Sequence, residues 1–459
     1  MAKSAIFLIQ GMHNTSMVSY YLLTYGCTLN HADSDRIIHM LDSLGHARIK
    51  DVSRPKAVSG ADVIVFNTCG VKGATHNRVL LRLSQFRAMG KPVVLTGCMY
   101  PCGAAVRNAN SNVVIVGTSC PDKIPEAIQD AIEGRAVEYI SQGSKEAPIP
   151  GIDGVIARIP ICEGCLGSCS YCFTKIARGE LKSFPVKDLR RSVEHAAAEG
   201  AREIQITAQD TGAYGKDINT NIIGLLQEIV AVPGNRVPGN YRIRLGMINP
   251  QHVTEYLDGL IEIYKSPRMY KFMHIPVQSG SDDVLKYMER KYDVETIRKI
   301  VPALRSKIPG LIVATDMIVG YPTETEEDFQ NSMGLLRQLR FDIVNVSKYS
   351  SRPFTLSNKM HKPLPVETVN GRSVEMSGLC REISLENNKA FLGKELAVTI
   401  TEIDKIKKDF KGRAGSYKQV VLKSMGERED KRDKDLKLGD EVTVRIVGAA
   451  SSGLIGEKI

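Results

Sequence analysis

The first part of the chain alternates short apolar runs with segments of helical periodicity. Residues 32–44, 78–89 and 123–132 place apolar side chains at helical spacing. The apolar runs between them predict buried strands at 20–25, 62–67, 92–96 and 112–116. Strands that are apolar on both faces, with helices between them, are typical of parallel sheets covered on both sides. The pattern therefore predicts a doubly wound parallel α/β sheet over residues 18–145.

The middle of the chain, residues 150–385, repeats strand and helix six times after a turn-rich linker at 143–154. The predicted strands lie near 154–160, 203–207, 241–246, 271–275, 311–316 and 342–346. The predicted helices lie near 187–199, 220–230, 253–264, 282–290 with 294–306, and 326–339. Six such units predict a (β/α)6 barrel, partial or complete, whose active face is formed by the loops after the strands. An open doubly wound sheet is the competing topology, because periodicity alone does not separate the two.

The two ends of the chain differ from this α/β pattern. Residues 388–459 contain short β-like runs at 396–402, 417–422 and 441–447, separated by charged or glycine-bearing turns. This predicts a small all-β barrel. Residues 1–17 show no periodicity, and we interpret them as an extension or as a misassigned start, with translation beginning at Met12 or Met17.

Composition agrees with about three domains and narrows the class of protein. The 459 residues carry 61 Lys+Arg against 51 Asp+Glu, a net charge of +10 that suggests a polyanionic partner, nucleic acid first. No apolar run approaches the ~20 residues of a membrane span, and no convincing signal peptide opens the chain. We therefore expect a cytoplasmic protein without a membrane partner. In that compartment, ten cysteines indicate metal binding or catalysis rather than disulfides.

One group of cysteines lies in the loop after the first predicted barrel strand. Cys165, Cys169 and Cys172 form a C-x3-C-x2-C spacing. Three thiolates this close can bind a [4Fe–4S] cluster and leave one iron open for chemistry, as a catalytic zinc keeps one open position. Adding Cys162 would give four ligands for a closed cluster or a structural zinc, but zinc pairs are normally separated by a longer stretch. We interpret Cys162 as a small buried hydrophobe.

A second group is dispersed along the chain. Cys27, Cys69 and Cys98 each follow a predicted parallel strand, and each has a glycine beside it. The carboxyl ends of parallel strands line one crevice, so these cysteines could converge on a second three-thiolate cluster. The other cysteines, Cys102, Cys120 and Cys380, have no such context and are expected in the core.

Together these motifs resemble the radical S-adenosylmethionine (SAM) methylthiotransferase family. The loop from Gly164 to Cys172 resembles the radical SAM signature, and the dispersed cysteines resemble the family's N-terminal cluster site. Further matching segments are 209–211, 244–247, 274–281, 316–322 and 349–353. The amino-acid sequence of residues 163–169 is similar to that of the archaeal and eukaryotic branch of the family, which acts on N6-threonylcarbamoyladenosine in tRNA. Phe354 is a departure, because this branch often has Gly there.

The resemblance implies an N-terminal methylthiotransferase domain, a radical SAM barrel and a C-terminal TRAM-like RNA-binding barrel. It implies two [4Fe–4S] clusters, with SAM serving as radical source and as methyl donor. The cluster at Cys165, Cys169 and Cys172 would cleave SAM to a 5′-deoxyadenosyl radical, and the other would supply sulfur. The product would carry a methylthio group at C2 of adenosine 37 in the anticodon loop of tRNA. An electron donor and a sulfur source are implied as partners.

Polar residues after the barrel strands are the candidates for binding SAM; they are Tyr171, Gln209, Asp210, Arg244, Gln278 and Ser279. Arg244 is expected to pair with the SAM carboxylate and Tyr171 to pack on the adenine. Arg413, Tyr417 and Lys418 at the C-terminal end are expected to contact tRNA, through phosphate neutralisation and base stacking. We expect no catalytic side chain beyond the cluster ligands.

Two other functions remain open at the level of sequence. A methylthiotransferase acting on an aspartate of a ribosomal protein would share both cysteine groups. A non-catalytic RNA-binding protein with structural clusters or zinc would share the basic C-terminal end. The similarity of the sequence around Cys165 to the archaeal and eukaryotic branch favours tRNA as the substrate.

Overall fold

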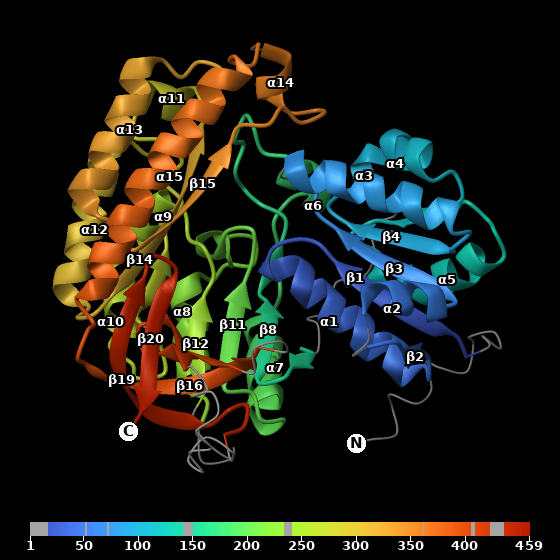
Figure 1. Cartoon of the computed structure of the whole chain (residues 1–459), viewed down its shortest axis with the longest axis horizontal. Coiled ribbons are helices and arrows are strands. Elements are labelled where there is room, and N and C mark those ends of the chain that lie inside the picture. Colours follow the sequence, from blue (N-terminus) through green and yellow to red (C-terminus); the bar gives the residue numbers. More distant parts are fainter. Residues whose placement is uncertain are drawn as a thin grey trace. The chain divides into compact units, whose positions relative to one another are not determined.

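The computed structural model describes residues 17–50, 53–70, 73–140, 150–233, 241–360, 362–404, 409–422 and 436–459 (Figure 1). The chain separates into two compact units, Met1–Lys145 and Glu146–Ile459. The predicted extension at 1–17 and the predicted linker at 143–154 fall mostly outside the described residues. The strands predicted at 388–459 belong to the same compact unit as the central α/β region.

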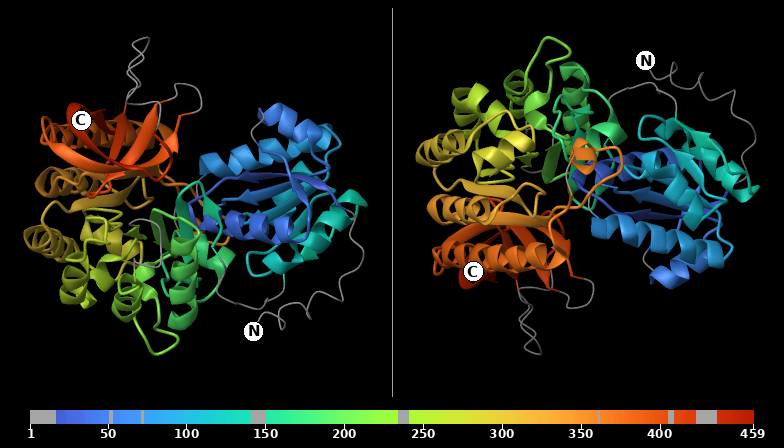
Figure 2. Two further views of the ribbon diagram at one scale, coloured as in Figure 1. Left: turned by 90° about the horizontal axis from the view of Figure 1, so that it is seen from below. Right: turned by 90° about the horizontal axis from the view of Figure 1, so that it is seen from above.

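The N-terminal unit is a parallel sheet with helices on both faces (Figures 1 and 2). Its strand order is β2-β1-β3-β4-β5-β6. The strands are β1 (Ser19–Thr24), β2 (Ala47–Arg48), β3 (Val63–Thr68), β4 (Val93–Gly97), β5 (Val114–Val116) and β6 (Glu138–Tyr139). The helices are α1 (Thr28–Ser43), α2 (Arg54–Gly60), α3 (Gly73–Ala88), α4 (Gly103–Ala109) and α5 (Ile124–Ile132). The predicted doubly wound sheet is confirmed.

The order of these strands defines where a ligand would bind. In β3, all six residues are buried, as expected of a central strand between two helical layers. After β1 the chain forms β2 on one side of β1, and it then forms β3 on the opposite side. Such a switch point opens a crevice at the carboxyl ends of the two central strands. Short edge elements such as β2 and α2 were not predicted, because they carry no clear apolar run.

The second unit contains six parallel strands in sequential order. The first three neighbours are β8 (Ile156–Pro160), β11 (Glu203–Thr207) and β12 (Arg242–Leu245), and the next three are β13 (Phe272–His274), β14 (Ile312–Val319) and β15 (Ile343–Lys348). A parallel bridge between Met247 and His274 joins the two halves. The order never reverses, as it would in an open doubly wound sheet. The arrangement is therefore an arc of (β/α)6 topology, and the competing topology is wrong.

The helices and short strands of this region follow the predicted units with small differences. The helices are α6 (Thr174–Arg178), α7 (Val186–Ala198), α8 (Ile222–Val230), α9 (Pro250–Glu255), α10 (Leu257–Tyr264), α11 (Asp282–Tyr287), α12 (Val294–Lys307), α13 (Glu326–Leu339) and α14 (Leu356–Met360). The short strands are β7 (Ile152–Asp153), β9 (Cys162–Glu163) and β10 (Lys182–Ser183). The helix predicted at 253–264 is divided in two, because Tyr256 leaves the helical conformation at a φ of −115°.

A long helix and a closed barrel complete the second unit. Helix α15 (Val366–Lys389) leads into β16 (Glu395–Ile403), β17 (Phe410–Ala414), β18 (Gln419–Leu422), β19 (Glu441–Ala450) and β20 (Gly453–Lys458). The five strands close in the order β16-β17-β18-β20-β19, which confirms the predicted small β barrel. This C-terminal barrel lies across the amino-terminal ends of the strands of the arc (Figure 1).

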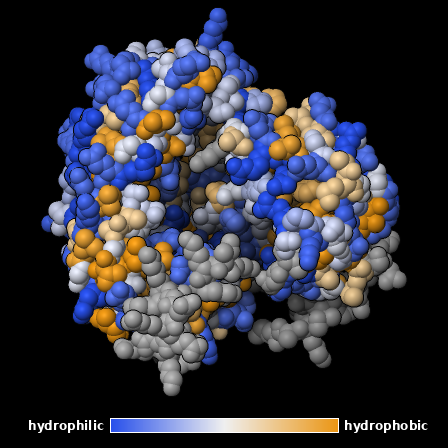
Figure 3. Space-filling view, in the orientation of Figure 1, coloured by the Kyte–Doolittle hydropathy of each residue, from blue (hydrophilic) through white to orange (hydrophobic). Residues whose placement is uncertain are grey.

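The surface contains no obvious apolar band on the face shown in Figure 3, where apolar residues form small groups among hydrophilic ones. Scattered exposed apolar side chains are normal for a globular chain. Within the described ranges, no helix combines the length and the apolar character needed to cross a bilayer.

Candidate functional site

The Cys165–Cys172 loop lies at the carboxyl end of β8, as predicted. After β8 the chain forms β9, which pairs with β10 in an antiparallel hairpin, and then turns at Gly164. Gly164 has a φ of +73°, and a Cβ there would lie 1.9 Å from the carbonyl oxygen of Glu180. Only glycine fits such a close backbone approach. The turn therefore fixes where the cysteine loop leaves the barrel.

Each of the three cysteine sulfurs of this loop receives a hydrogen bond. The amide of Gly167 donates to Cys165 Sγ at 3.2 Å, and the amide of Thr174 donates to Cys172 Sγ at 3.4 Å. Cys169 Sγ accepts from the Nη1 of Arg290 at 3.1 Å. Such donors stabilise a thiolate and tune a cluster bound to it. The surroundings of all three sulfurs thus suit thiolate ligands.

Two of these sulfurs face a common point beside Gly167. A Cβ added to Gly167 would lie 3.3 Å from Cys165 Sγ and 3.7 Å from Cys169 Sγ, in space that glycine leaves empty. Burial raises the pKa of the Cys165 thiol to about 12 and also raises that of Cys172. Metal binding deprotonates such thiols. The donors, the open space and the intermediate exposure of the three cysteines fit a [4Fe–4S] cluster.

Cys162, by contrast, belongs to the hydrophobic core. Its side chain is fully buried in the cluster that includes Ile161 and Tyr214. The predicted burial of Cys162 is confirmed, and its exclusion from the ligand set stays a prediction. Cys102, Cys120 and Cys380 are also buried, as expected.

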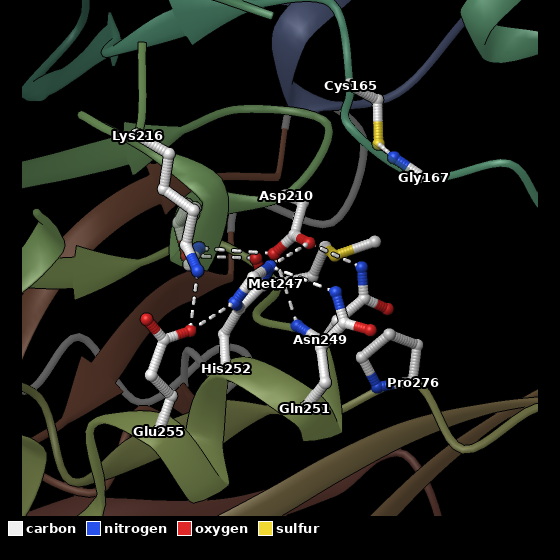
Figure 4. A network of polar contacts seen from close by, with 12 residues as sticks. Cys165, Gly167, Asp210, Lys216, Met247, Asn249, Gln251, His252, Glu255 and Pro276 are labelled. Carbon is white, nitrogen blue, oxygen red and sulfur yellow. Dashed lines mark hydrogen bonds and ion pairs between the residues drawn. The ribbon is translucent and has the colours of Figure 1, made fainter. Parts of the chain in front are cut away.

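A network of polar side chains around Asp210, Asn249 and His252 lies at the carboxyl ends of β11 and β12 (Figure 4), and Arg290 links it to Cys169 Sγ. Arg290 contacts Asn249 Oδ1, and Asn249 donates its Nδ2 to Asp210 Oδ2 at 2.5 Å. Asp210 Oδ2 lies 3.4 Å from His252 Nε2. His252 Nδ1 lies 3.1 Å from Glu255 Oε2, which also pairs with Lys216 at 2.6 Å. The network thus joins the Cys169 side chain to the residues that follow β11 and β12.

Sequence reasoning missed most of this network. Asn249 follows the third strand, so the strand-end rule that selected Gln209 and Gln278 could have found it. Arg290 follows helix α11 in a stretch with no motif, and only the tertiary structure brings it to Cys169.

Three of the predicted SAM contacts lie where such a role is possible. The buried Oε1 of Gln209 has no hydrogen-bond partner among the described residues, so it can accept a bond from a ligand. Gln278 has a φ of +72°, a strained conformation that is typical of functional sites. Tyr171 packs edge-on against Tyr321 with ring centroids 6.5 Å apart. Their contacts with SAM stay predictions.

The structure gives other roles to Asp210 and Ser279. Both carboxylate oxygens of Asp210 are engaged, since they accept from Gly212 N at 3.1 Å and from Asn249. Asp210 therefore positions its neighbours. Ser279 is fully buried, and its hydroxyl accepts from Ser281 N at 3.2 Å. The expectation that Ser279 contacts SAM is corrected, because its side chain points into the packing against α13.

Arg244 also lies elsewhere than expected. Its guanidinium stacks over the rings of Phe272 and Tyr417, 5.4 Å and 5.9 Å from their centroids. Tyr417 belongs to the C-terminal barrel and lies at the amino-terminal end of the arc. Because the long side chain extends toward that end, the predicted pairing with the SAM carboxylate is corrected.

The second cysteine group follows three neighbouring strands of the N-terminal sheet. Cys27, Cys69 and Cys98 stand just beyond β1, β3 and β4, which are adjacent and parallel. Cys27 is exposed, and the other two are buried. Cys27 and Cys69 flank the switch point of the sheet. The structure thus brings the three cysteines to one edge, as predicted.

A network of amides supports this edge. Asn30 Nδ2 donates to Asn67 Oδ1 at 3.2 Å, and Asn67 Nδ2 donates back to the carbonyl of Asn30 at 2.7 Å. Gly97, with a φ of +84°, lets the chain before Cys98 approach Asn67, since a Cβ would lie 2.3 Å from its Oδ1. Asn30 and Asn67 thereby set the spacing between the cysteine turns.

Among the described residues, no three His, Cys, Asp or Glu side chains are grouped closely enough to hold a single metal ion. A cluster distributes its ligands over several irons. The strand ends on which the cysteines lie, and the donors around them, therefore define the two sites.

The predicted RNA contacts of the C-terminal barrel are largely corrected. Lys418 is only 4% exposed; its Nζ donates to Asn388 Oδ1 at 2.6 Å and lies 3.6 Å from Asp342. Tyr417 donates its hydroxyl to Glu203 Oε1 at 2.7 Å inside the arc. Both side chains are used to attach the barrel, which sequence alone did not reveal. Arg413 stacks on Tyr417 at 4.8 Å and stays partly exposed, and its RNA contact remains a prediction.

Comparison with known proteins finds a family match over each of the two regions that carry the cysteine groups. Residues 159–336 match the radical SAM superfamily, and residues 19–117 match an uncharacterized protein family, UPF0004. A radical SAM methyltransferase from Kitasatospora setae, TsrM, has a similar fold, with a TM-score of 0.54 and 14% identity over 74% of this chain and 77% of that one.

Relatives with named activities cover almost the whole chain. A probable threonylcarbamoyladenosine tRNA methylthiotransferase of Pyrococcus horikoshii is 36% identical over 96% of this chain and 100% of its own length. The Drosophila melanogaster and human enzymes of that name are 33% and 32% identical, over 95% and 88% of this chain and 77% and 69% of their own lengths. The chain therefore belongs to the threonylcarbamoyladenosine tRNA methylthiotransferase family of radical SAM enzymes.

Proposed function

We propose that this chain converts N6-threonylcarbamoyladenosine in tRNA to its 2-methylthio derivative. The observation that carries the proposal is the pair of cysteine groups, each at the carboxyl ends of parallel strands, in a chain of this family. One open cluster accounts for radical formation and the other for the sulfur. A binding protein with structural metal sites would need neither open iron.

The cluster that reacts with SAM is assigned to Cys165, Cys169 and Cys172. Their sulfurs have hydrogen-bond donors and face the space beside Gly167. The auxiliary cluster is assigned to Cys27, Cys69 and Cys98. When bound, SAM and the clusters supply the radical, the sulfur and the methyl group, whereas the protein orients the substrate and excludes water.

The chain's own residues would bind SAM at the carboxyl ends of the arc strands. Gln209 offers its unpartnered oxygen to a hydroxyl or amino group of SAM. Gln278 holds the turn after β13 through its backbone, accepting from Ile318 N at 2.9 Å and donating to Asp316 O at 2.8 Å. Tyr171 lies between two of the cysteine ligands and offers a ring face for the adenine.

We place the reaction in the cytoplasm, where thiols stay reduced and tRNA is available. A protein or small-molecule reductant must deliver the electron, and a sulfur source must restore the auxiliary cluster after each turnover. Adenosine 37, in the single-stranded anticodon loop, is the proposed target, since an unstacked base can enter a pocket.

The test is mass spectrometry of tRNA nucleosides from cells that lack the gene and express either the wild-type chain or a variant. The wild type should restore the 2-methylthio nucleoside, and Cys169→Ala should leave only the unmodified threonylcarbamoyladenosine. Cys162→Ala, three residues before Cys165, is the matched control and should restore the product and keep the iron. Product formation by Cys169→Ala, or a methylthio group found on a ribosomal protein instead of tRNA, would contradict the proposal.

A further inference from the structure

Arg290 occupies a position in this site that the reaction as proposed does not explain. It follows helix α11, far in sequence from the cysteine loop, yet its Nη1 lies 3.1 Å from Cys169 Sγ. A cation that donates to a thiolate forms a short, strong hydrogen bond.

Most N–H groups of the Arg290 guanidinium donate to fixed acceptors. Its Nε donates to the Tyr292 hydroxyl at 2.8 Å, and its Nη2 contacts Asn249 Oδ1 and lies 3.4 Å from the Pro276 carbonyl. It also lies 5.0 Å from the centroid of the Tyr292 ring. Four of the five N–H groups of the guanidinium therefore have acceptors. Little donor capacity remains for a SAM carboxylate.

The anchor of Arg290 is itself fixed. Asn249 is held by Asp210 through its amide N–H at 3.2 Å and through Nδ2 at 2.5 Å. The Tyr292 hydroxyl donates to the Val277 carbonyl at 2.9 Å. Asn249 lies in the turn after β12, and the Tyr292 hydroxyl bonds to the turn after β13, so the position of the cation is set by the arc and not by the cysteine loop. Such support keeps a donor in one geometry.

We propose that Arg290 is a positioning residue that holds the Cys169 sulfur and raises the reduction potential of the cluster bound there. This inference rests on the assignment of that cluster to Cys165, Cys169 and Cys172. A one-electron reduction makes a cluster more negative, and a fixed positive charge in hydrogen-bond contact with one of its sulfurs favours the reduced state. The electron still comes from the external reductant.

The experiment measures the potential of this cluster in the full-length protein. The auxiliary cysteines Cys27, Cys69 and Cys98 are changed to Ala, so that one cluster remains, and the protein is reconstituted anaerobically. Reduced cluster is followed by electron paramagnetic resonance during a potentiometric titration, and SAM binding is measured by calorimetry. The variants are Arg290→Gln and Arg290→Lys, with Arg298→Gln as the matched control. Arg298 is a partly exposed arginine on α12 that bonds to Gln338 at 3.0 Å.

Arg290→Gln should reduce the ratio of reduced to oxidised cluster about tenfold at a fixed potential, which is a shift of 59 mV for a one-electron couple. Arg290→Lys should recover most of this shift because it keeps the charge, and Arg298→Gln should leave the potential unchanged. Loss of iron from Arg290→Gln alone, with iron retained by Arg290→Lys, would also support a cation holding Cys169.

Three results would overturn the inference. One is an unchanged potential in Arg290→Gln with a full complement of iron. Another is a loss of SAM binding with an unchanged potential, which would make Arg290 a SAM ligand. The third is loss of iron from both arginine variants. A parent protein that binds no iron would instead contradict the cluster assignment in the proposed function.

Discussion

The two ends of the (β/α)6 arc are built for different purposes. At the carboxyl end lie the cysteine loop, a buried Gln209 oxygen without a partner and the strained Gln278. At the amino end, Tyr417 and Lys418 of the C-terminal barrel have their polar atoms paired. A cysteine loop at one end and the packed contacts of the barrel at the other are what a reactive face and a stabilising face require.

The contacts at the amino end show how much of the C-terminal barrel is structural. The tip between β17 and β18 places Tyr417 against Tyr270 and Phe272, with ring centroids 4.9 Å away in each case. The amide of Lys271 donates to the Gly415 carbonyl at 2.9 Å. The segment that was expected to bind RNA therefore closes the amino end of the arc. Only the exposed strands of the C-terminal barrel are available to contact RNA.

The largest expected effect is a loss of activity from a substitution at the carboxyl end of the arc. Cys169→Ala should abolish SAM cleavage, a loss of more than about a thousandfold, because a cluster with two cysteine ligands cannot present a stable open iron. Deoxyadenosine formation on reduction with dithionite measures this. The melting temperature of the protein prepared without iron should change little, and a large drop would mean that the loop also supports the fold.

Tyr417→Ala, at the amino end of the arc, should have the opposite effect: it should lower stability. Removing the ring from Tyr270 and Phe272, and the hydroxyl from Glu203, should lower the free energy of unfolding by roughly 2–4 kcal/mol. Urea unfolding of the full-length protein, followed through the transition of the second unit, measures the change in the free energy of unfolding. Tyr417→Phe keeps the ring and should cost only about 1 kcal/mol. If Tyr417→Ala instead left stability unchanged but weakened tRNA binding, Tyr417 would be an RNA contact after all.

Gln209→Ala tests the unpartnered oxygen at the carboxyl end. Since this oxygen has no bond to lose in the free protein, stability should hold, whereas SAM affinity should fall about tenfold, or ~1.4 kcal/mol. Calorimetric titration of SAM into the reconstituted protein measures this. The matched control is Gln205→Ala, four residues earlier in β11, whose Nε2 bonds to Glu203 at 2.5 Å; it should leave the SAM affinity unchanged.

The smallest expected effect concerns the loop before α14. Phe354 is 60% exposed and has a φ of +69°, a conformation that costs a non-glycine residue about 1–2 kcal/mol. Phe354→Gly should therefore stabilise the protein by up to ~1 kcal/mol. Leu356→Gly, at the start of α14, should instead destabilise it by about that amount. Thermal unfolding of the two variants measures both effects, and a lower melting temperature for Phe354→Gly would contradict the first.

The two cysteine groups show how far sequence patterns reach. Cys165, Cys169 and Cys172 could be assigned from their spacing, because eight consecutive residues constrain their own geometry. For Cys27, Cys69 and Cys98, the apolar runs before each were enough to predict parallel strands, and the parallel arrangement aligned the strand ends. Arg290 and Tyr417 could not be found this way, since each acts across more than a hundred residues of sequence.

The sequence by itself determined most strands and helices of both α/β regions, the proposed cysteine ligands and the family. These depend on local periodicity, on spacing and on motifs that lie within one loop. Tertiary structure decided which charged and aromatic side chains face the cluster and which close the opposite end of the arc. Their partners come from distant segments, and a long side chain such as that of Arg244 can extend toward either end of a strand. Only the packed neighbours determine which direction it takes.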